Sequence, residues 1–318
     1  MNMESPTSDW MASLPERLIS VPLNQLAIPG SHDSSTFGLD KTLELGKSEN
    51  WFLRFLANNK ITGCIVKEIA YKWSVTQSKG YTEQLELGIR YFDLRTEKRN
   101  KDSLYYFVHG LYGPKVFDCM NEVNEFLEKH PKEVVLLDFN HFYTMEDADH
   151  EAVVKTVLEI FGKKICPWHN DLPVRLSLAD MWKNDWQVLM FYANDDMALK
   201  YEQLWPSSYM PSPWANTMDI KSLLQFLTKN YGEKRPSFEV CQGVITPQTV
   251  TVVKHLSGSI RKNCADKLNP RFTAWLKGKV RGSCVEGEAG GINICIMDFV
   301  ETCGYIQQVL VLNTDSPV

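Results

Sequence analysis

The sequence predicts an α/β protein built as a single, distorted (β/α)8 barrel of the TIM type, and three observations support this. Strand-like and helix-like stretches alternate along the chain. Several strand-like stretches are apolar at nearly every position, as expected for parallel strands covered on both faces. The 318 residues contain no internal repeat and no evident linker. A doubly wound sheet is the alternative, but no Gly-x-Gly-x-x-Gly motif follows any strand, which disfavours its nucleotide-binding version.

Seven short apolar stretches, closed by glycine, proline or polar residues, predict the strands. They cover residues 24–29, 88–95, 104–110, 133–142, 186–193, 237–246 and 291–300. An eighth strand could come from the irregular segment 207–214. Apolar residues spaced three and four apart predict the helices between them. These cover residues 48–59, 118–131, 147–162, 197–205, 219–232, 251–268 and 305–313.

Helix-capping residues predict where several helices begin and end. Asp118 and Asp219 are the expected N-caps of their helices, and Gly162 is expected to end another. We set residues 1–20 apart as an N-terminal extension and assign residues 21–318 to the barrel domain.

Composition excludes several classes of protein. The net charge of −5 argues against a nucleic-acid binder. The eight cysteines are scattered without a C-x-x-C pair, which argues against a zinc site or a thioredoxin-like motif. No apolar run approaches the roughly 20 residues that a membrane-spanning helix needs. We therefore expect a cytoplasmic protein in a reducing compartment, with a nuclear location left open.

Polar side chains follow the predicted strands at the points where the strands end. In a (β/α) barrel these ends meet at one rim, where such barrels place their active sites. A single His at a strand end is more often a structural residue, but five strands deliver ionisable or amide groups to this rim. The groups are His32, Asp33, Asp93, Arg95, His109, Asn140, His141 and Asp298.

These residue types suit phosphoryl chemistry. Two imidazoles can act as base and acid near neutral pH, a guanidinium suits a pair of phosphoryl oxygens, and carboxylates can orient imidazoles. There is no G-x-S-x-G nucleophile elbow for acyl transfer. The set therefore predicts attack on phosphorus by a hydroxyl of the substrate itself.

Four motifs carry a resemblance to a known family. "PGSHDS" (29–34), "GIRYFDLR" (88–95), "FVHG" (107–110) and "IMDF" (296–299) resemble, in this order, the X domain of phosphatidylinositol-specific phospholipase C. With "SDWMASLPERL" (8–18) and "PSPWANT" (211–217), the chain is similar to the small eukaryotic X-domain-only proteins. The resemblance assigns residues 21–318 to the X domain, and we expect no PH, C2, EF-hand or Y domain beside it.

The resemblance implies catalytic roles and a phosphoinositide lipid substrate. His32 corresponds to the general base for the inositol 2-hydroxyl, and Asp298 to the carboxylate that orients it. His109 corresponds to the general acid that protonates the diacylglycerol oxygen, and Asp33 to its partner. Arg95 corresponds to the group that neutralises the phosphate, which Asp93 supports. The family's products are diacylglycerol and an inositol cyclic phosphate.

The resemblance also implies that no metal or other cofactor is needed. In the calcium-dependent eukaryotic enzymes an Asn follows the first catalytic His, and a carboxylate stands at the position of Arg95. This chain has Asp33 and Arg95 instead, as in the metal-free bacterial branch, and a fixed guanidinium can replace a dication electrostatically. Asp33, Asp93 and Asp298 could still hold calcium, which stays an open alternative.

The chain departs from the bacterial pattern at the headgroup contacts. Where those enzymes place a Lys after the fourth strand, this chain has Asn140 and His141, and the next strand closes at Tyr192 without a basic residue. We take Asp93, Asn140, His141 and Tyr192 as the substrate contacts, and the alternative for Asn140 and His141 is that they only close the end of the strand. The phosphorylation state of the lipid stays undetermined, as do protein partners.

An aromatic, proline-rich stretch at 203–216 is the candidate membrane contact, through Trp205, Tyr209 and Trp214. The alternative is that these rings cap the barrel core. We expect transient membrane association.

Two other functions stay open: a phosphoinositide-binding pseudoenzyme, which the missing basic headgroup residues favour, and a metal-dependent glycerophosphodiesterase, which Arg95 disfavours.

Overall fold

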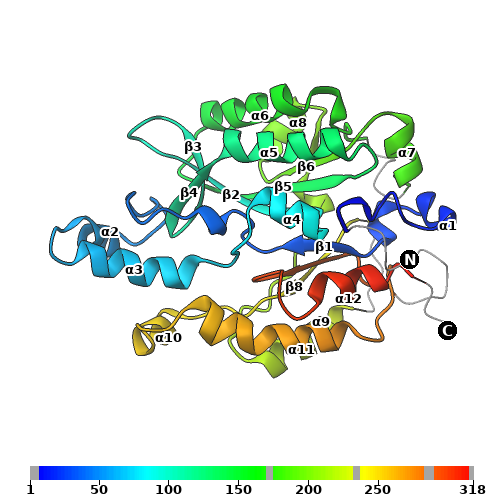
Figure 1. The fold of residues 1–318 in the computed structure, drawn as a ribbon. Coiled ribbons are helices and arrows are strands. Elements are labelled where there is room, and N and C mark those ends of the chain that lie inside the picture. Colours follow the sequence, from blue (N-terminus) through cyan, green and yellow to red (C-terminus); the bar gives the residue numbers. More distant parts are fainter. Residues whose placement is uncertain (1–6, 170–174, 232–236, 283–289, 315–318) are drawn as a thin grey trace.

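The computed structural model describes residues 7–169, 175–231, 237–282 and 290–314. Its centre is a curled sheet of nine strands, with helices on the outside (Figure 1). The strands are β1 Ile28–Ser31, β2 Tyr91–Lys98, β3 Tyr105–His109, β4 Leu111–Lys115, β5 Val135–Tyr143, β6 Val188–Tyr192, β7 Leu204–Pro206, β8 Val240–Gly243 and β9 Ile294–Met297.

The sheet runs in the order β7-β6-β5-β2-β1-β9-β8, with parallel pairing along this path. In the described part of the chain β7 and β8 do not pair with each other, so the barrel is open between them. The prediction of a single distorted TIM-like barrel is confirmed. β5 and β6 show the burial expected of parallel strands covered on both faces, because residues 135–139 and 188–192 are all buried.

Two strand predictions need correction. The predicted strand 104–110 is β3, which pairs antiparallel with both β2 and β4 and forms a hairpin beside the parallel path. The segment 207–214 holds a short 3-10 turn, η5 Ser207–Tyr209, and no strand. The additional parallel strand is β7, which overlaps the end of the predicted helix 197–205.

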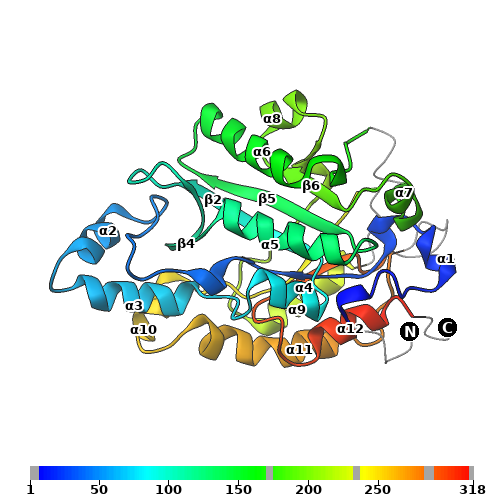
Figure 2. The same cartoon turned by 45° about the horizontal axis from the view of Figure 1, so that its top comes forward.

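The longer helices surround the sheet (Figures 1 and 2). The α-helices are α1 Glu16–Ile19, α2 Trp51–Asn58, α3 Gly63–Ser74, α4 Tyr81–Leu87, α5 Val116–Lys129, α6 Asp147–Phe161, α7 Leu178–Lys183, α8 Asp195–Lys200, α9 Ile220–Asn230, α10 Thr249–Lys254, α11 Asp266–Leu276 and α12 Tyr305–Val311. Short turns are η1 Thr7–Asp9, η2 Leu23–Gln25, η3 Thr36–Gly38, η4 Gly162–Lys164 and the π-turn η6 Arg261–Ala265.

Helix boundaries differ from the prediction where a local signal is ambiguous. Lys115 is the N-cap of α5, and Asp118 lies in its first turn, where a carboxylate also favours the helix dipole. Asp219 caps α9 as expected, accepting from the amide of Ser222 at 2.7 Å. The predicted helix 251–268 is interrupted, because Gly258 lies in a turn between α10 and the π-turn that leads into α11.

The segment before residue 21 packs against the barrel. Trp10 is fully buried and its indole donates to the carbonyl of Gly88 at 3.0 Å. Glu133, fully buried before β5, accepts from the amide of Ala12 at 3.0 Å and pairs with buried Arg90 at 2.8 Å. The division at residue 20 stays a prediction.

Candidate active site

A pocket of about 640 Å³ opens at the carboxyl ends of the parallel strands. It collects side chains from β1, β2, β3, β5 and β9, or from the residues that follow them. All the catalytic residues predicted from the sequence line it, as do three of the four predicted substrate contacts. These residues are His32, Asp33, Asp93, Arg95, His109, Asn140, His141 and Asp298.

The end of β1 presents two adjacent residues to this pocket. A Cβ at Gly30 would lie 2.7 Å from the Tyr91 ring, so only glycine lets β1 approach β2 this closely. Asp33 adopts a positive φ of 43°, a conformation that Asp tolerates better than most residues. Its amide donates to Asp93 Oδ2 at 2.8 Å, which ties the turn to β2.

His32 is held by two elements that are far apart in sequence. Its Nδ1 lies 2.7 Å from Asp298 Oδ1, and its carbonyl accepts from Gln77 Nε2 at 2.9 Å. Burial alone would lower the pKa of His32, but the charges of Asp33 and Asp298 and the hydrogen bond to Asp298 raise it to about 9. When Nδ1 donates to Asp298, the deprotonated Nε2 carries the lone pair with which His32 can act as a base.

His109 reaches the pocket on the β3–β4 hairpin. Its Nδ1 donates to the carbonyl of Ser74 at 2.7 Å, since a carbonyl can only accept. The other nitrogen, Nε2, lies 3.5 Å from Asp33 Oδ2, and His32 Nε2 lies 3.4 Å from the same oxygen. Asp33 therefore lies between the two imidazoles.

Arg95 completes the cluster. Its Nε lies 2.5 Å from Asp33 Oδ1 and its Nη2 lies 3.4 Å from Asp93 Oδ2. Burial would raise the pKa of Asp93, but the charges of Arg95 and His32 hold it well below its usual value. Arg95 Nη2 also lies 3.2 Å from His32 Nε2; because a guanidinium can only donate, this contact requires neutral His32.

Comparison of the sequence with curated proteins shows the family of this chain. The chain is 41% identical over 314 residues to human "PI-PLC X domain-containing protein 3", a match that covers 98% of this chain and 94% of the relative. Human "PI-PLC X domain-containing protein 1" is 33% identical, with 98% of this chain and 94% of the relative covered. The chain belongs to the PI-PLC X domain-containing proteins. No model in a collection of protein families matches it.

Solved structures confirm the fold of this PI-PLC X domain-containing protein. The phosphatidylinositol-specific phospholipase C of Listeria monocytogenes aligns with a TM-score of 0.67 at 19% identity, over 98% of this chain and all of the bacterial one. The Staphylococcus aureus phosphatidylinositol-specific phospholipase C aligns with a TM-score of 0.64 at 15% identity, over 98% of each chain. At such identities the likeness concerns the fold.

Arg95 already pairs with the carboxylates that could bind a metal ion. His32, Asp33 and Asp93 each offer a ligand atom, all within 4.8 Å of one another. However, Arg95 pairs with both carboxylates, so a dication would have to displace it or accept its repulsion.

Sequence reasoning missed a buried carboxylate on the pocket wall. Asp138 accepts from the Tyr91 hydroxyl at 2.5 Å and from Asn140 Nδ2 at 3.1 Å. Burial raises the pKa of Asp138 to about 7, against hydrogen bonds that lower it. The sequence did offer a signal for Asp138, namely a single carboxylate inside the apolar run "VVLLDF". An Asp is seldom fully buried unless it is paired, so such a position indicates a specific partner. Gln77 was missed too, with no signal in its neighbourhood.

Two predicted contacts are wrong because their side chains are inside the protein. Tyr192 is fully buried, with its hydroxyl 3.0 Å from His150 Nδ1, and it does not line the pocket. Trp205 is also fully buried, and its indole donates to the carbonyl of Cys166. Both rings belong to strands, β6 and β7, and face the core.

The remaining aromatic candidates differ from each other. Tyr209 is half-buried against the ring of Trp168. Trp214 is 53% exposed, lines the pocket and donates to Thr246 Oγ1 at 2.9 Å. Of the three, only Trp214 is therefore a large exposed ring at the pocket.

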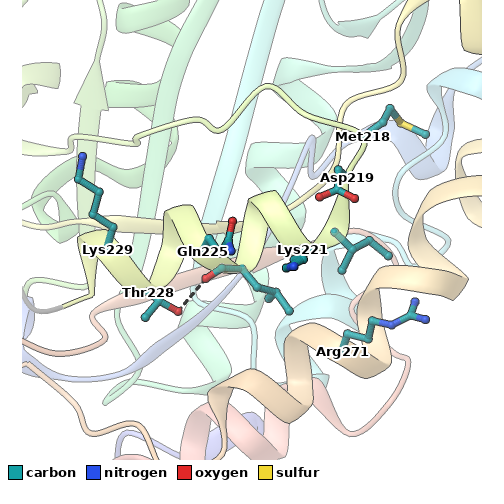
Figure 3. A pocket seen from close by; sticks show the side chains of 9 residues that line it. Met218, Asp219, Lys221, Gln225, Thr228, Lys229 and Arg271 are labelled. Carbon is teal, nitrogen blue, oxygen red and sulfur yellow. Dashed lines mark hydrogen bonds between the residues drawn. The ribbon is translucent and has the colours of Figure 1, made fainter.

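A larger hollow, of about 920 Å³, lies elsewhere, along α9 and α11 (Figure 3). It is wide and shallow and contains none of the catalytic candidates. Its lining consists of Met218, Asp219, Ile220, Lys221, Leu224, Gln225, Thr228, Lys229 and Arg271. Without an imidazole beside these groups it offers no comparable acid–base chemistry.

Proposed function

We propose that this protein is a phosphodiesterase that cleaves phosphatidylinositol, or a phosphorylated relative, to diacylglycerol and an inositol cyclic phosphate. One observation carries the proposal: the Nε2 atoms of His32 and His109 both face Asp33, while Arg95 pairs with the same carboxylate. Two proton-transfer groups and one guanidinium therefore share a pocket of about 640 Å³.

In the proposed reaction His32 Nε2 takes the proton from the inositol 2-hydroxyl, whose oxygen attacks phosphorus. The bond from phosphorus to the glycerol oxygen breaks, and the Nε2–H of His109 gives that oxygen its proton. Arg95 offsets the negative charge of the phosphoryl oxygens as it redistributes. Asp298 keeps the His32 proton on Nδ1, so that the reactive nitrogen faces the substrate.

The proposal includes no calcium. Arg95 supplies the positive charge near Asp33 and Asp93, where a bound cation would otherwise be needed. We expect a chelator to leave turnover unchanged. A chelator-sensitive reaction would favour a metal-dependent glycerophosphodiesterase instead.

Contact with the membrane is assigned to a different surface from the one that the sequence suggested. The helix α2 exposes Trp51, Phe52 and Phe55, with Trp51 74% exposed, and α10 exposes Val250 and Val253. Both helices lie at the same end of the molecule (Figures 1 and 2). We call these five side chains the rim patch.

The rim patch borders the pocket. Val252 of α10 lines the pocket, and so do Glu49, just before α2, and Trp73, in α3. Lysines and arginines outnumber glutamates around α2 and α3, with Lys47, Arg54, Lys60, Lys67 and Lys72 against Glu49 and Glu68. Apolar side chains with cations around them suit an anionic lipid surface. In the described residues no helix is long and apolar enough to cross a bilayer.

The test of the proposed function is turnover by the purified protein. Vesicles with labelled phosphatidylinositol should yield diacylglycerol and cyclic phosphate, with and without chelator. His32→Ala and His109→Ala should each lower kcat by about 10²–10⁴-fold with circular dichroism unchanged. The exposed His255→Ala, outside the pocket, is the control and should retain activity.

Two outcomes would contradict this proposal. Near-normal activity in a folded His32 or His109 variant would refute two-histidine catalysis. Binding of the lipid headgroup without any turnover would instead support the pseudoenzyme, which lacks the basic headgroup residue at Asn140 and His141.

A further inference from the structure

The charges that line the active-site pocket are unusual for a site that takes a phosphorylated headgroup. Among the described lining residues the one Lys or Arg side chain is Arg95, and Asp33 and Asp93 already pair with it. The carboxylates of the lining are Asp33, Glu49, Asp93, Asp138 and Asp298. A ring phosphate would add about 1.5 to 2 negative charges to this pocket, and no second guanidinium or ammonium lines it to receive them.

Asn140 is not free to bind a phosphate either. Its Nδ2 donates to Asp93 Oδ1 at 2.9 Å and to Asp138 Oδ2 at 3.1 Å, so both carboxylates fix the orientation of the amide. The amide oxygen then faces His141, 2.7 Å from its Nδ1. Because an amide oxygen can only accept, the His141 proton must lie on Nδ1.

This chain of hydrogen bonds makes His141 Nε2 an acceptor. Partial desolvation and the nearby charge of Arg95 both lower the pKa of His141, although the side chain is exposed, and the lower pKa favours the neutral ring. Within the described part of the chain Nε2 has no hydrogen-bond partner. A lone pair at this place can receive a hydroxyl proton, whereas an ionised phosphate oxygen, itself an acceptor, is repelled.

We propose that the pocket selects a headgroup whose ring carries free hydroxyls and rejects one with ring phosphates, and that His141 is a specificity-determining residue. This inference rests on the proposed function, whose substrate it narrows to unphosphorylated phosphatidylinositol. The rest of the lining agrees, because its polar side chains Ser207, Ser212, Gln242 and Thr246 are uncharged. Such groups suit a polyol.

The test compares phosphatidylinositol with phosphatidylinositol 4-phosphate and 4,5-bisphosphate, in vesicles brought to equal surface charge with phosphatidylserine. The wild-type kcat/KM should be at least about tenfold higher for the unphosphorylated lipid. His141→Lys should reduce this ratio about tenfold, because it replaces an acceptor with a cation. His141→Gln should preserve the preference.

The matched control is Gln225→Lys on α9, which adds a lysine outside the pocket and should leave the ratio unchanged. A wild-type preference for a phosphorylated lipid would overturn the inference. So would an equal ratio in His141→Lys and Gln225→Lys.

A binding measurement separates this inference from the proposed catalysis. Calorimetry would compare glycerophosphoinositol with its ring 4-phosphate, on the wild-type protein and on His141→Lys. If the protein binds the unphosphorylated compound more tightly but cleaves no lipid, the proposed activity fails and the selectivity stands. Equal or tighter binding of the phosphorylated compound would refute the selectivity whatever the turnover.

Discussion

Asp33 lies between two imidazoles and a guanidinium, and its own side chain is almost fully buried. Neither of its oxygens has an aligned hydrogen-bond donor among the described residues, although Arg95 Nε lies 2.5 Å away. The carboxylate is therefore held by charge and by the turn after β1.

The pH profile should depend on Asp298. Because the base must be deprotonated and the pKa of His32 is raised to about 9, kcat/KM should rise from pH 7 to pH 9. Asp298→Asn keeps an acceptor near Nδ1 but removes a charge that raises this pKa. We expect the rising limb to move to lower pH and the maximum to fall roughly tenfold or more.

The control for this profile is Glu125→Gln, an exposed carboxylate on α5. It should follow the wild-type pH dependence. A rising limb that stays in place in Asp298→Asn would mean that Asp298 does not set the basicity of His32.

Arg95→Lys should not behave as a conservative change. An ammonium is a compact charge and cannot reproduce the planar contacts with Asp33, Asp93 and a phosphoryl group together. We expect kcat to fall about 10²-fold or more with a smaller change in KM, measured in the vesicle assay. An unaltered kcat would assign Arg95 a structural role.

Among the elements, the β3–β4 hairpin and the α2–α3 pair decide how the pocket is bounded. His109 enters from an antiparallel strand, and its Nδ1 bonds to the last residue of α3, Ser74. The position of this imidazole therefore depends on the packing of α3. The helix α2 contributes little to the core, since only Ala57 of its residues is buried.

The rim patch should matter for vesicles and not for dissolved substrate. Trp51→Ser with Phe55→Ser removes two rings, and burying each in lipid is worth about 1.5–3 kcal/mol. We expect activity on phosphatidylinositol vesicles to fall at least about tenfold, and activity on a short-chain soluble analogue to stay unchanged.

Val311→Ser at the end of α12 is the control for the rim patch. Its side chain is 46% exposed, and it lies near Asn313, which bonds to Ala27 just before β1 and so at the opposite end of the strands. Equal losses on vesicles and soluble substrate in the Trp51/Phe55 variant would show that these rings shape the pocket.

For the whole molecule, a buried ion pair connects the N-terminal segment to the barrel. Glu133 and Arg90 are both fully buried, and the guanidinium also donates to the carbonyl of Ser8 at 2.7 Å. Trp10 and Met11 of the same segment belong to the main core. The segment therefore stabilises the end of the barrel opposite the pocket.

Glu133→Gln should destabilise the protein, because it leaves the charge of Arg90 buried without compensation. We expect a loss of about 3–5 kcal/mol in the free energy of unfolding, measured by urea denaturation. Glu83→Gln, which removes the exposed partner of Lys79, should change stability little. A loss in Glu133→Gln as small as in this control would contradict the role of the pair.

The sequence by itself determined most of the strands and the residues at the strand ends, although it did not predict β4, β7, α3 or α4. Both follow from local signals: apolar stretches such as 133–142 are periodic over a few residues, and parallel strands bring their carboxyl ends to one rim. That is why His32, Asp33, Arg95 and Asp298 could be assigned to one pocket.

Only the tertiary structure decided which side chains are buried, paired or exposed. The ring of Trp205 is inside and that of Trp51 is outside, although both lie in apolar stretches. Asn140 is engaged by Asp93 and Asp138, which no spacing indicates. Burial and pairing result from contacts between segments far apart in sequence, and a local pattern contains no information about what packs against it.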